Sequence, residues 1–195
     1  MTKKHKINFK KNSILMLSLV VVIAVGIFFI DIIKNKTEEG FKLGGRFLLI
    51  DQNELNFDSQ TSKKKKLIYF GYTYCPDVCP FDILKLSKFI DKNPSFKEKL
   101  DFIFITVDPE RDQPQQLKSF LANFNSSIIG LTGSKKQIED VIKKFRIFVK
   151  IHKNSSDDQN YLVDHSSLFF LVDGNDNYLT HFRPSDFDSK IQSLL

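Results

Sequence analysis

Two cysteines are the residues of this sequence best suited to chemistry. Cys75 and Cys79 are the only cysteines among the 195 residues, and three residues separate them. Three kinds of chemistry fit such a pair: a structural disulfide, a redox-active dithiol, or a metal site built on two thiolates. A structural disulfide here would close a very short loop and would remove little entropy from the unfolded chain. The redox pair and the metal site are therefore the stronger interpretations.

The place of the cysteines supports both of these interpretations. Residues 67–70 are an apolar run typical of a buried strand, and a helical pattern follows Cys79, so the pair stands at a strand-to-helix junction. A helix N-terminus lowers the pKa of a thiol, but thioredoxin-like redox enzymes separate their cysteines by two residues rather than three. Positions i and i+4 of a helix share one face, so both sulfurs could reach one ion. Two thiolates with an imidazole suit Cu(I).

A metal site would need a further ligand, and the sequence has four histidines. His5 lies in the basic tail that precedes the apolar segment, while His152 and His181 are in polar surroundings typical of a surface. His165 immediately precedes an apolar strand. In a thioredoxin-like fold the chain that enters this strand passes beside the cysteines and usually carries a cis-proline there, which this sequence lacks. His165 is therefore the candidate third ligand.

Chain patterning indicates how these residues are positioned. A hairpin is expected over residues 47–50 and 55–57. Apolar runs typical of buried strands occupy residues 67–70, 102–107 and 128–131. A second hairpin is indicated by a turn signal between residues 167–172 and 178–182. Helices are expected after Cys79, over residues 113–124, after a capping box at Ser134 and Gln137, and over residues 185–194. This order predicts an α/β, thioredoxin-like domain with a mixed sheet flanked by helices.

An apolar segment precedes this domain. Residues 13–30 carry no charge and would rise about 27 Å as a helix, close to the thickness of a hydrocarbon core. No small-residue cleavage site follows, so we expect an uncleaved transmembrane helix over residues 13–33. Five lysines before residue 12 place the 1–12 tail in the cytoplasm. The sequence thus predicts a single-pass bacterial inner-membrane protein, with a linker over residues 34–45 and a periplasmic domain over residues 46–195.

Charge argues against binding to nucleic acid. The net charge is +6, and without the five N-terminal lysines it is +1, so the folded part is nearly neutral. Residues 63–66 are four consecutive lysines. We interpret them as a solvated turn before a strand rather than as a binding patch.

Three motifs resemble those of the Sco/SenC family. They are FGYTYCPDVCP at residues 70–80, VDPERD at residues 107–112 and DHSS at residues 164–167, and GLTG at residues 130–133 also matches. The resemblance covers about residues 44–182. The sequence departs from the family pattern at residues 63–66, where a Gly-Lys pair is frequent, and at Tyr74, where His or Ser is frequent.

The resemblance implies a function as well as a fold. It implies a membrane-anchored thioredoxin fold that holds one copper ion through Cys75, Cys79 and His165, and a role in assembling the binuclear copper centre of cytochrome c oxidase subunit II. We therefore expect a copper chaperone rather than an enzyme, with subunit II and an upstream copper donor as partners. Asp77 is a candidate for tuning the thiols, and Asp108 and Arg111 for bracing the loop beside them.

Two enzymatic functions compete with copper transfer. A thiol:disulfide oxidoreductase would use Cys75 and Cys79 as a redox pair and would not need His165. A peroxidase on the same fold usually has a threonine three residues before its reactive cysteine, but Tyr72 and Pro76 hold these positions. The oxidoreductase is thus the stronger enzymatic alternative.

Overall fold

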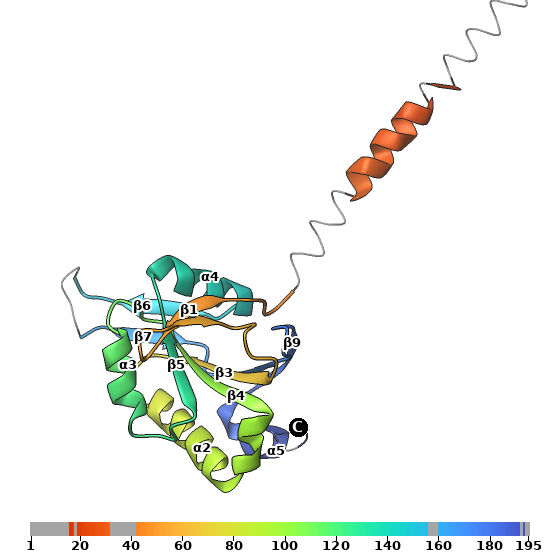
Figure 1. The fold of residues 1–195 in the computed structure, drawn as a ribbon. Coiled ribbons are helices and arrows are strands. Elements are labelled where there is room, and N and C mark those ends of the chain that lie inside the picture. Colours follow the sequence, from red (N-terminus) through yellow and green to blue (C-terminus); the bar gives the residue numbers. More distant parts are fainter. Residues whose placement is uncertain (1–15, 18, 32–41, 156–159, 192, 194–195) are drawn as a thin grey trace, which may run out of the picture. The chain divides into compact units, whose positions relative to one another are not determined.

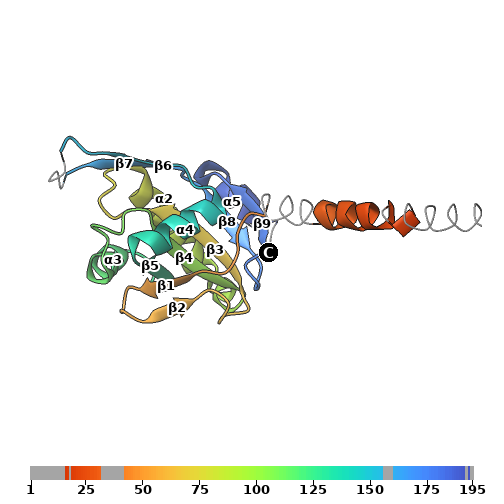
Figure 2. The same ribbon diagram turned by 90° about the horizontal axis from the view of Figure 1, so that it is seen from above.

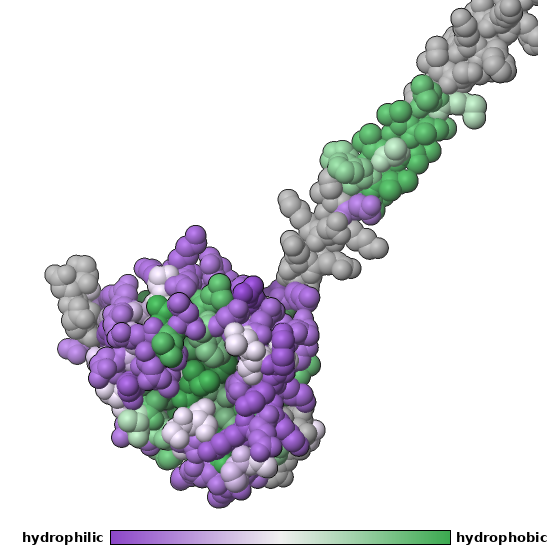
Figure 3. Space-filling view, in the orientation of Figure 1, coloured by the Kyte–Doolittle hydropathy of each residue, from purple (hydrophilic) through white to green (hydrophobic). Residues whose placement is uncertain are grey.

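The structure is a computed structural model that describes residues 16–17, 19–31, 42–155, 160–191 and 193. The chain divides into two compact units, residues 1–42 and 43–195. In the first unit residues 19–31 are helical and exposed, with a largely apolar surface (Figure 3). No helix within the described residues is both long and apolar enough to cross a membrane. Residues 13–15, 18, 32 and 33 of the predicted anchor lie outside the described residues.

A seven-stranded mixed sheet forms the centre of the second unit (Figures 1 and 2). Its strand order is β2-β1-β5-β4-β3-β8-β9, in which β5, β4 and β3 are parallel and the other pairs are antiparallel. The strands are β1 (Leu48–Asp51), β2 (Asn56–Asp58), β3 (Lys65–Gly71), β4 (Leu100–Thr106), β5 (Ile128–Thr132), β8 (Phe169–Val172) and β9 (Tyr178–Phe182).

Helices cover both faces of this sheet, so β3 and β4 are buried on both sides. Aromatic contacts show which face each helix covers, since successive residues of a strand point to opposite faces. Phe70 and Phe170 pack on Phe145 of α4 (Lys135–Phe145). On the opposite face Phe169 packs on Phe187 of α5 (Phe187–Ile191), and Phe104 packs on α3 (Pro114–Leu121). The helix α2 (Val78–Lys92) lies with α3 and α5 on this second face (Figure 1).

The expected elements are present with small shifts of their ends. The hairpin of β1 and β2, the three parallel strands and the hairpin of β8 and β9 all form. The capping box at Ser134 and Gln137 begins α4 as predicted. The predicted C-terminal helix is shorter, because the 3₁₀ turn η2 (Pro184–Asp186) precedes α5, and another 3₁₀ turn, η1 (Pro94–Glu98), leads into β4.

The interpretation of residues 63–66 as a solvated turn is wrong at its C-terminal end. The strand β3 begins at Lys65, and the Lys66 side chain is fully buried. Its ammonium lies 3.0 Å from a carboxylate oxygen of Asp176, which is also fully buried. A buried cation needs such a partner, and the partner is supplied by a turn 110 residues further along the chain.

Residues 149–152 and 162–165 pair as a hairpin that sequence patterning did not predict. Here β6 (Val149–His152) pairs with β7 (Leu162–His165) in an antiparallel two-stranded sheet of its own. Figures 1 and 2 show this β6–β7 hairpin extending beyond the edge of the main sheet. Its strand β7 ends at His165, so the candidate ligand lies on a regular strand rather than in a loop.

Candidate metal centre

The two cysteines lie at the C-terminal end of β3, where the chain turns into α2. Cys75 is half-buried in the turn, and Cys79 is fully buried in the first turn of α2. Both are free thiols. Gly71 ends β3 directly against the buried sulfur, since a Cβ at this position would lie 3.0 Å from the Cys79 Sγ. The absence of a side chain at Gly71 thus makes room for the Cys79 thiol.

A buried carboxylate fixes the turn that precedes Cys75. Asp112 accepts hydrogen bonds from the Thr73 amide at 2.9 Å, the Thr73 hydroxyl at 2.6 Å and the Thr106 hydroxyl at 2.7 Å. Thr106 ends β4, so Asp112 joins the cysteine turn to the neighbouring strand. Burial raises the pKa of Asp112, and the three donors oppose part of that effect. The sequence alone gives no sign of this role of Asp112.

His165 meets the cysteines from the other side. Its Nε2 lies 3.2 Å from the Cys79 Sγ. Its Nδ1 lies 3.2 Å from the Ser166 carbonyl oxygen, which can only accept a hydrogen bond, so the proton of a neutral ring belongs on Nδ1. The Nε2 lone pair is then directed toward the cysteines. The rings of Tyr69 and Tyr72 meet the imidazole edge-on, at centroid distances of 6.4 Å and 6.0 Å.

The two thiols have different electrostatic surroundings. The pKa of Cys75 is lowered to about 3, chiefly by a hydrogen bond from the Cys79 side chain, against the effect of partial burial. The pKa of Cys79 is raised, because the neighbouring Cys75 and burial both disfavour a second thiolate. Without a cation, this pair therefore holds one thiolate, at the more exposed position.

Arg111 attaches the β6–β7 hairpin to the body of the domain. Its guanidinium lies 3.5 Å from the ring centroid of Tyr161 and 4.8 Å from that of Tyr74, and it bonds the buried Asp108 at 2.6 Å. Tyr161 donates its hydroxyl to the other oxygen of Asp108, also at 2.6 Å. The sequence predicts that Asp108 and Arg111 brace the loop beside the cysteines. In the structure they also hold the strand that carries His165.

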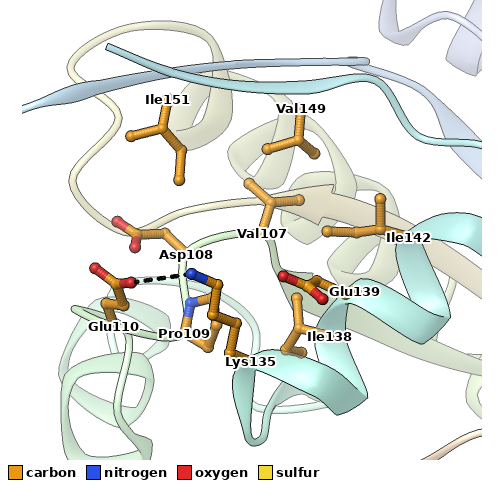
Figure 4. A pocket seen from close by; sticks show the side chains of 10 residues that line it. All are labelled: Val107, Asp108, Pro109, Glu110, Lys135, Ile138, Glu139, Ile142, Val149 and Ile151. Atoms are coloured by element: carbon orange, nitrogen blue, oxygen red, sulfur yellow. Dashed lines mark ion pairs between the residues drawn. The ribbon is translucent and has the colours of Figure 1, made fainter. Parts of the chain in front are cut away.

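A hollow lies under the other strand of the hairpin (Figure 4). It has a volume of about 390 Å³ and lies between β6, α4 and the loop after β4. Apolar side chains line most of it, namely Val107, Ile138, Ile142, Val149 and Ile151. Lys135 and Glu110 form an ion pair of 3.8 Å at its rim. The hairpin is therefore held mainly along β7, on the side of His165.

The other polar candidates lie elsewhere or act differently. His152 is exposed and pairs with Asp164 at 2.7 Å, and His181 is exposed and bonds the Tyr178 hydroxyl. His5 lies outside the described residues. Asp77 is exposed, and its backbone amide rather than its carboxylate helps to lower the pKa of Cys75.

Cys75, Cys79 and His165 are brought together into one candidate metal centre. Their ligand atoms all lie within 4.8 Å of one another. Two sulfurs and one imidazole nitrogen form a soft ligand set with few members, which fits Cu(I) better than a structural zinc ion with four ligands. Fold and site together define a thioredoxin-like metal-binding domain.

Comparison with known proteins identifies the family. The SCO1/SenC family model matches residues 35–194, so this chain belongs to the SCO1/SenC family. An SCO2-like protein of Rickettsia conorii is 44% identical over 149 residues, which are 76% of this chain and 73% of that protein. The copper-bound structure of Bradyrhizobium japonicum ScoI matches with a TM-score of 0.69 and 34% identity, covering 78% of this chain and 99% of the other.

A second similar structure carries a further observation. It is that of BsSco, described as a member of the Sco family of cytochrome c oxidase assembly proteins in which a disulfide switch was identified. It matches with a TM-score of 0.59 and 26% identity, over 78% of this chain and 94% of the other. Copper is thus the metal bound in a similar solved structure, and Cys75, Cys79 and His165 of this chain are positioned to bind a metal.

Proposed function

We propose that this protein is a membrane-anchored copper chaperone that delivers copper to the binuclear centre of cytochrome c oxidase subunit II. The observation that carries the proposal is the convergence of two sulfurs and one imidazole nitrogen within 4.8 Å. The copper-bound structure of a similar protein supports the choice of metal. One chain would hold one copper ion, which is cargo rather than a resident cofactor, and an upstream donor would supply it.

Delivery by ligand exchange suits the unequal exposure of the cysteines. Cys75 is half-buried and Cys79 is fully buried, so a partner thiolate approaches from the side of Cys75. A bond between the partner sulfur and copper forms as the bond to Cys75 breaks, and exchange at His165 and Cys79 follows. Copper keeps its oxidation state, and each released thiolate takes up a proton or stays ionised according to its surroundings.

The location of the protein follows from its N-terminal sequence. The apolar residues 13–33 would anchor the chain in a bacterial inner membrane, and the lysines before them would hold residues 1–12 in the cytoplasm. The metal centre would then lie in the periplasm. A copper domain of subunit II on the same side of the membrane would be within its reach.

Copper titration of matched variants tests the metal centre. The full-length protein in detergent is reduced, loaded anaerobically with Cu(I), and titrated against a chromophoric Cu(I) chelator. We expect one copper per chain, and an affinity at least roughly tenfold lower for His165→Ala, because a ligand is lost. The control is His152→Ala, which removes an exposed histidine of the same hairpin. Equal affinity in all three proteins would refute the ligand assignment.

A second function is favoured by the state of the thiols. Cys75 has a pKa of about 3 and is half-buried, and Cys79 lies beside it. As a thiol:disulfide oxidoreductase, Cys75 would attack a partner disulfide, and Cys79 would then displace the partner from the mixed disulfide. The products are a Cys75–Cys79 disulfide and two partner thiols, so two electrons pass to the partner.

The two functions differ in their need for His165. Reduction of a disulfide in a subunit II peptide would be lost in Cys79→Ser and retained in His165→Ala if the oxidoreductase is the function. Copper transfer to the same peptide would be impaired in both variants if the chaperone is the function. Measuring both reactions with the wild type, Cys79→Ser and His165→Ala separates the alternatives.

A further inference from the structure

A second cluster of polar side chains lies behind the metal centre. The Tyr69 hydroxyl of β3 donates to a carboxylate oxygen of Asp82 on α2 at 2.7 Å. The Ser167 hydroxyl donates to the same oxygen, also at 2.7 Å, and the two hydroxyl oxygens lie 2.9 Å apart. One carboxylate oxygen of Asp82 therefore joins a strand, a helix and the segment between β7 and β8.

Each member of this cluster is close to a metal ligand. Asp82 lies three residues after Cys79, on the same helix, and Ser167 lies two residues after His165. Tyr69 is fully buried, and the edge-on contact between its ring and the His165 imidazole has a centroid distance of 6.4 Å. The hydrogen bond from Ser167 to Asp82 thus connects the helix that carries Cys79 to the segment that follows His165.

Backbone pairing reaches Ser166, whose amide donates to the Phe148 carbonyl at 3.1 Å, but it does not continue through Ser167. The strand β7 ends at His165, β8 begins at Phe169, and the ladder between β3 and β8 ends at the pair of Tyr69 and Phe169. Ser167 lies between the two ladders. A side-chain hydrogen bond at this point fixes the chain where the sheet does not. A hydrogen bond to a charged carboxylate is also stronger than one between neutral groups.

From these contacts we infer that Asp82 is a positioning residue for His165, acting through Ser167 and Tyr69. The cluster holds the imidazole Nε2 within reach of Cys79, and it thereby sets the contribution of the histidine to copper affinity. Tyr69 contacts the His165 ring, and Asp82 bonds the hydroxyls of both Tyr69 and Ser167, but none of the three is a ligand. This inference deepens the proposed function and rests on it for the identity of the metal.

Removing the Ser167 hydroxyl tests the inference without changing a ligand. Groups that orient metal ligands typically contribute roughly 10- to 100-fold to metal affinity, so we expect Ser167→Ala to weaken Cu(I) binding by at least about tenfold. Ser167→Thr keeps a hydroxyl and should restore most of the affinity. The matched control is Ser87→Ala, which removes a buried α2 hydroxyl that bonds the Asn125 amide at 2.8 Å, away from the metal centre.

A double-mutant cycle shows whether the cluster acts through His165. If it does, Ser167→Ala has no further effect on Cu(I) affinity in a His165→Ala background, and Asp82→Asn behaves in the same way. An equal loss of affinity with and without His165 would overturn the inference, because it would indicate a general loss of stability. Unchanged affinity of Ser167→Ala in the wild-type background would overturn it too.

A measurement on the reduced, metal-free protein separates this inference from the proposed function. Nitrogen-15 NMR of the His165 ring reports which nitrogen carries the proton. We expect a single tautomer protonated on Nδ1 in the wild type and in Ser87→Ala, and a mixture of tautomers in Ser167→Ala and Asp82→Asn. If the His165 ring of Ser167→Ala shows the same single tautomer as the wild type, the positioning role is refuted, even if the protein binds no copper. Failure of wild-type protein to bind Cu(I) would instead refute the proposed function.

Discussion

At the scale of single residues, the two cysteines have different roles although they are only four positions apart. Cys75 is half-buried and its thiolate is stabilised chiefly by a hydrogen bond from Cys79. Cys79 is fully buried against Gly71, and its pKa is raised. Cys75 is thus the reactive and accessible sulfur, while Cys79 is held in place by the fold.

This difference predicts how the thiols react with an alkylating agent. In the reduced, metal-free protein, iodoacetamide should modify Cys75 at a rate nearly independent of pH between about pH 5 and pH 8, since its pKa of about 3 leaves it ionised throughout that range. Cys79 should react far more slowly. Mass spectrometry of the digested protein measures both rates.

A variant identifies the cause of the low pKa. Cys79→Ala removes the thiol that stabilises the Cys75 thiolate most. We expect a higher Cys75 pKa in this variant, so that alkylation slows at the acidic end of the range. A wild-type rate that rises tenfold per pH unit from pH 5 to pH 8 would contradict the assignment.

At the scale of secondary structure, the β6–β7 hairpin decides where His165 lies. Among the described residues of this region, the side chains of Tyr161 and Val163 are buried, whereas most of β6 is exposed above the hollow. The hydrogen bond from Tyr161 to Asp108 and the contact with Arg111 hold its C-terminal strand. The position of the histidine thus depends on side-chain contacts as well as on backbone pairing.

Tyr161→Phe tests this attachment. The change leaves one oxygen of the buried Asp108 without its phenolic donor, and it should lower the free energy of local opening of the hairpin by roughly 1–3 kcal/mol. Hydrogen exchange of the β6 and β7 amides should accelerate, while that of β3 and β4 stays unchanged. Tyr178→Phe, which removes an exposed phenol bonded to His181, is the control. Uniform acceleration across all strands would contradict a local role.

At the scale of the whole domain, a buried ion pair joins β3 to the turn of the β8–β9 hairpin. Lys66 and Asp176 are both fully buried, with 3.0 Å between the ammonium and the carboxylate. The other oxygen of Asp176 accepts a bond from the Ser59 hydroxyl at 2.6 Å, and the Asp176 carbonyl accepts one from the Gly45 amide. The N-terminal segment of the domain, β3 and the β8–β9 turn are thus joined at one point.

Asp176→Asn should therefore destabilise the domain strongly. The backbone at this position has a positive φ of 64°, which asparagine tolerates well, so the loss of charge is the main change. The Lys66 ammonium would remain buried without a counter-charge, at a cost of about 3–5 kcal/mol in the free energy of unfolding. Urea denaturation followed by circular dichroism measures it.

A compensating variant and a surface control complete this test. Adding Lys66→Met to Asp176→Asn removes the buried charge and should recover most of the lost stability. Asp58→Asn breaks the exposed pair with Arg46, which lies at 2.7 Å, and should have a much smaller effect. If the double variant is as unstable as Asp176→Asn, the buried charge is not the cause.

Much of this protein is determined by local sequence patterns. Apolar runs predict β3, β4 and β5, the turn residues 173–176 predict the β8–β9 hairpin, and Ser134 with Gln137 predicts the start of α4. These features depend on residues close together in the chain, so the sequence alone specifies them. The strand-to-helix junction at the two cysteines is also predicted, but Cys75 lies in the turn before α2, so the rule that positions i and i+4 of a helix share a face does not apply to this pair.

Tertiary structure decided the features that depend on distant residues. Alternation of apolar and polar residues in Val149–His152 is a strand signal, but neither it nor Leu162–His165 identifies the other as its partner. Three contacts arise only when the sheet assembles. They are the approach of His165 to Cys79, the buried ion pair of Lys66 with Asp176, and the hydrogen bonds of Asp82 with Tyr69 and Ser167. The physical reason is that local periodicity specifies which face of an element is apolar, whereas contacts between side chains far apart in sequence depend on how these faces pack.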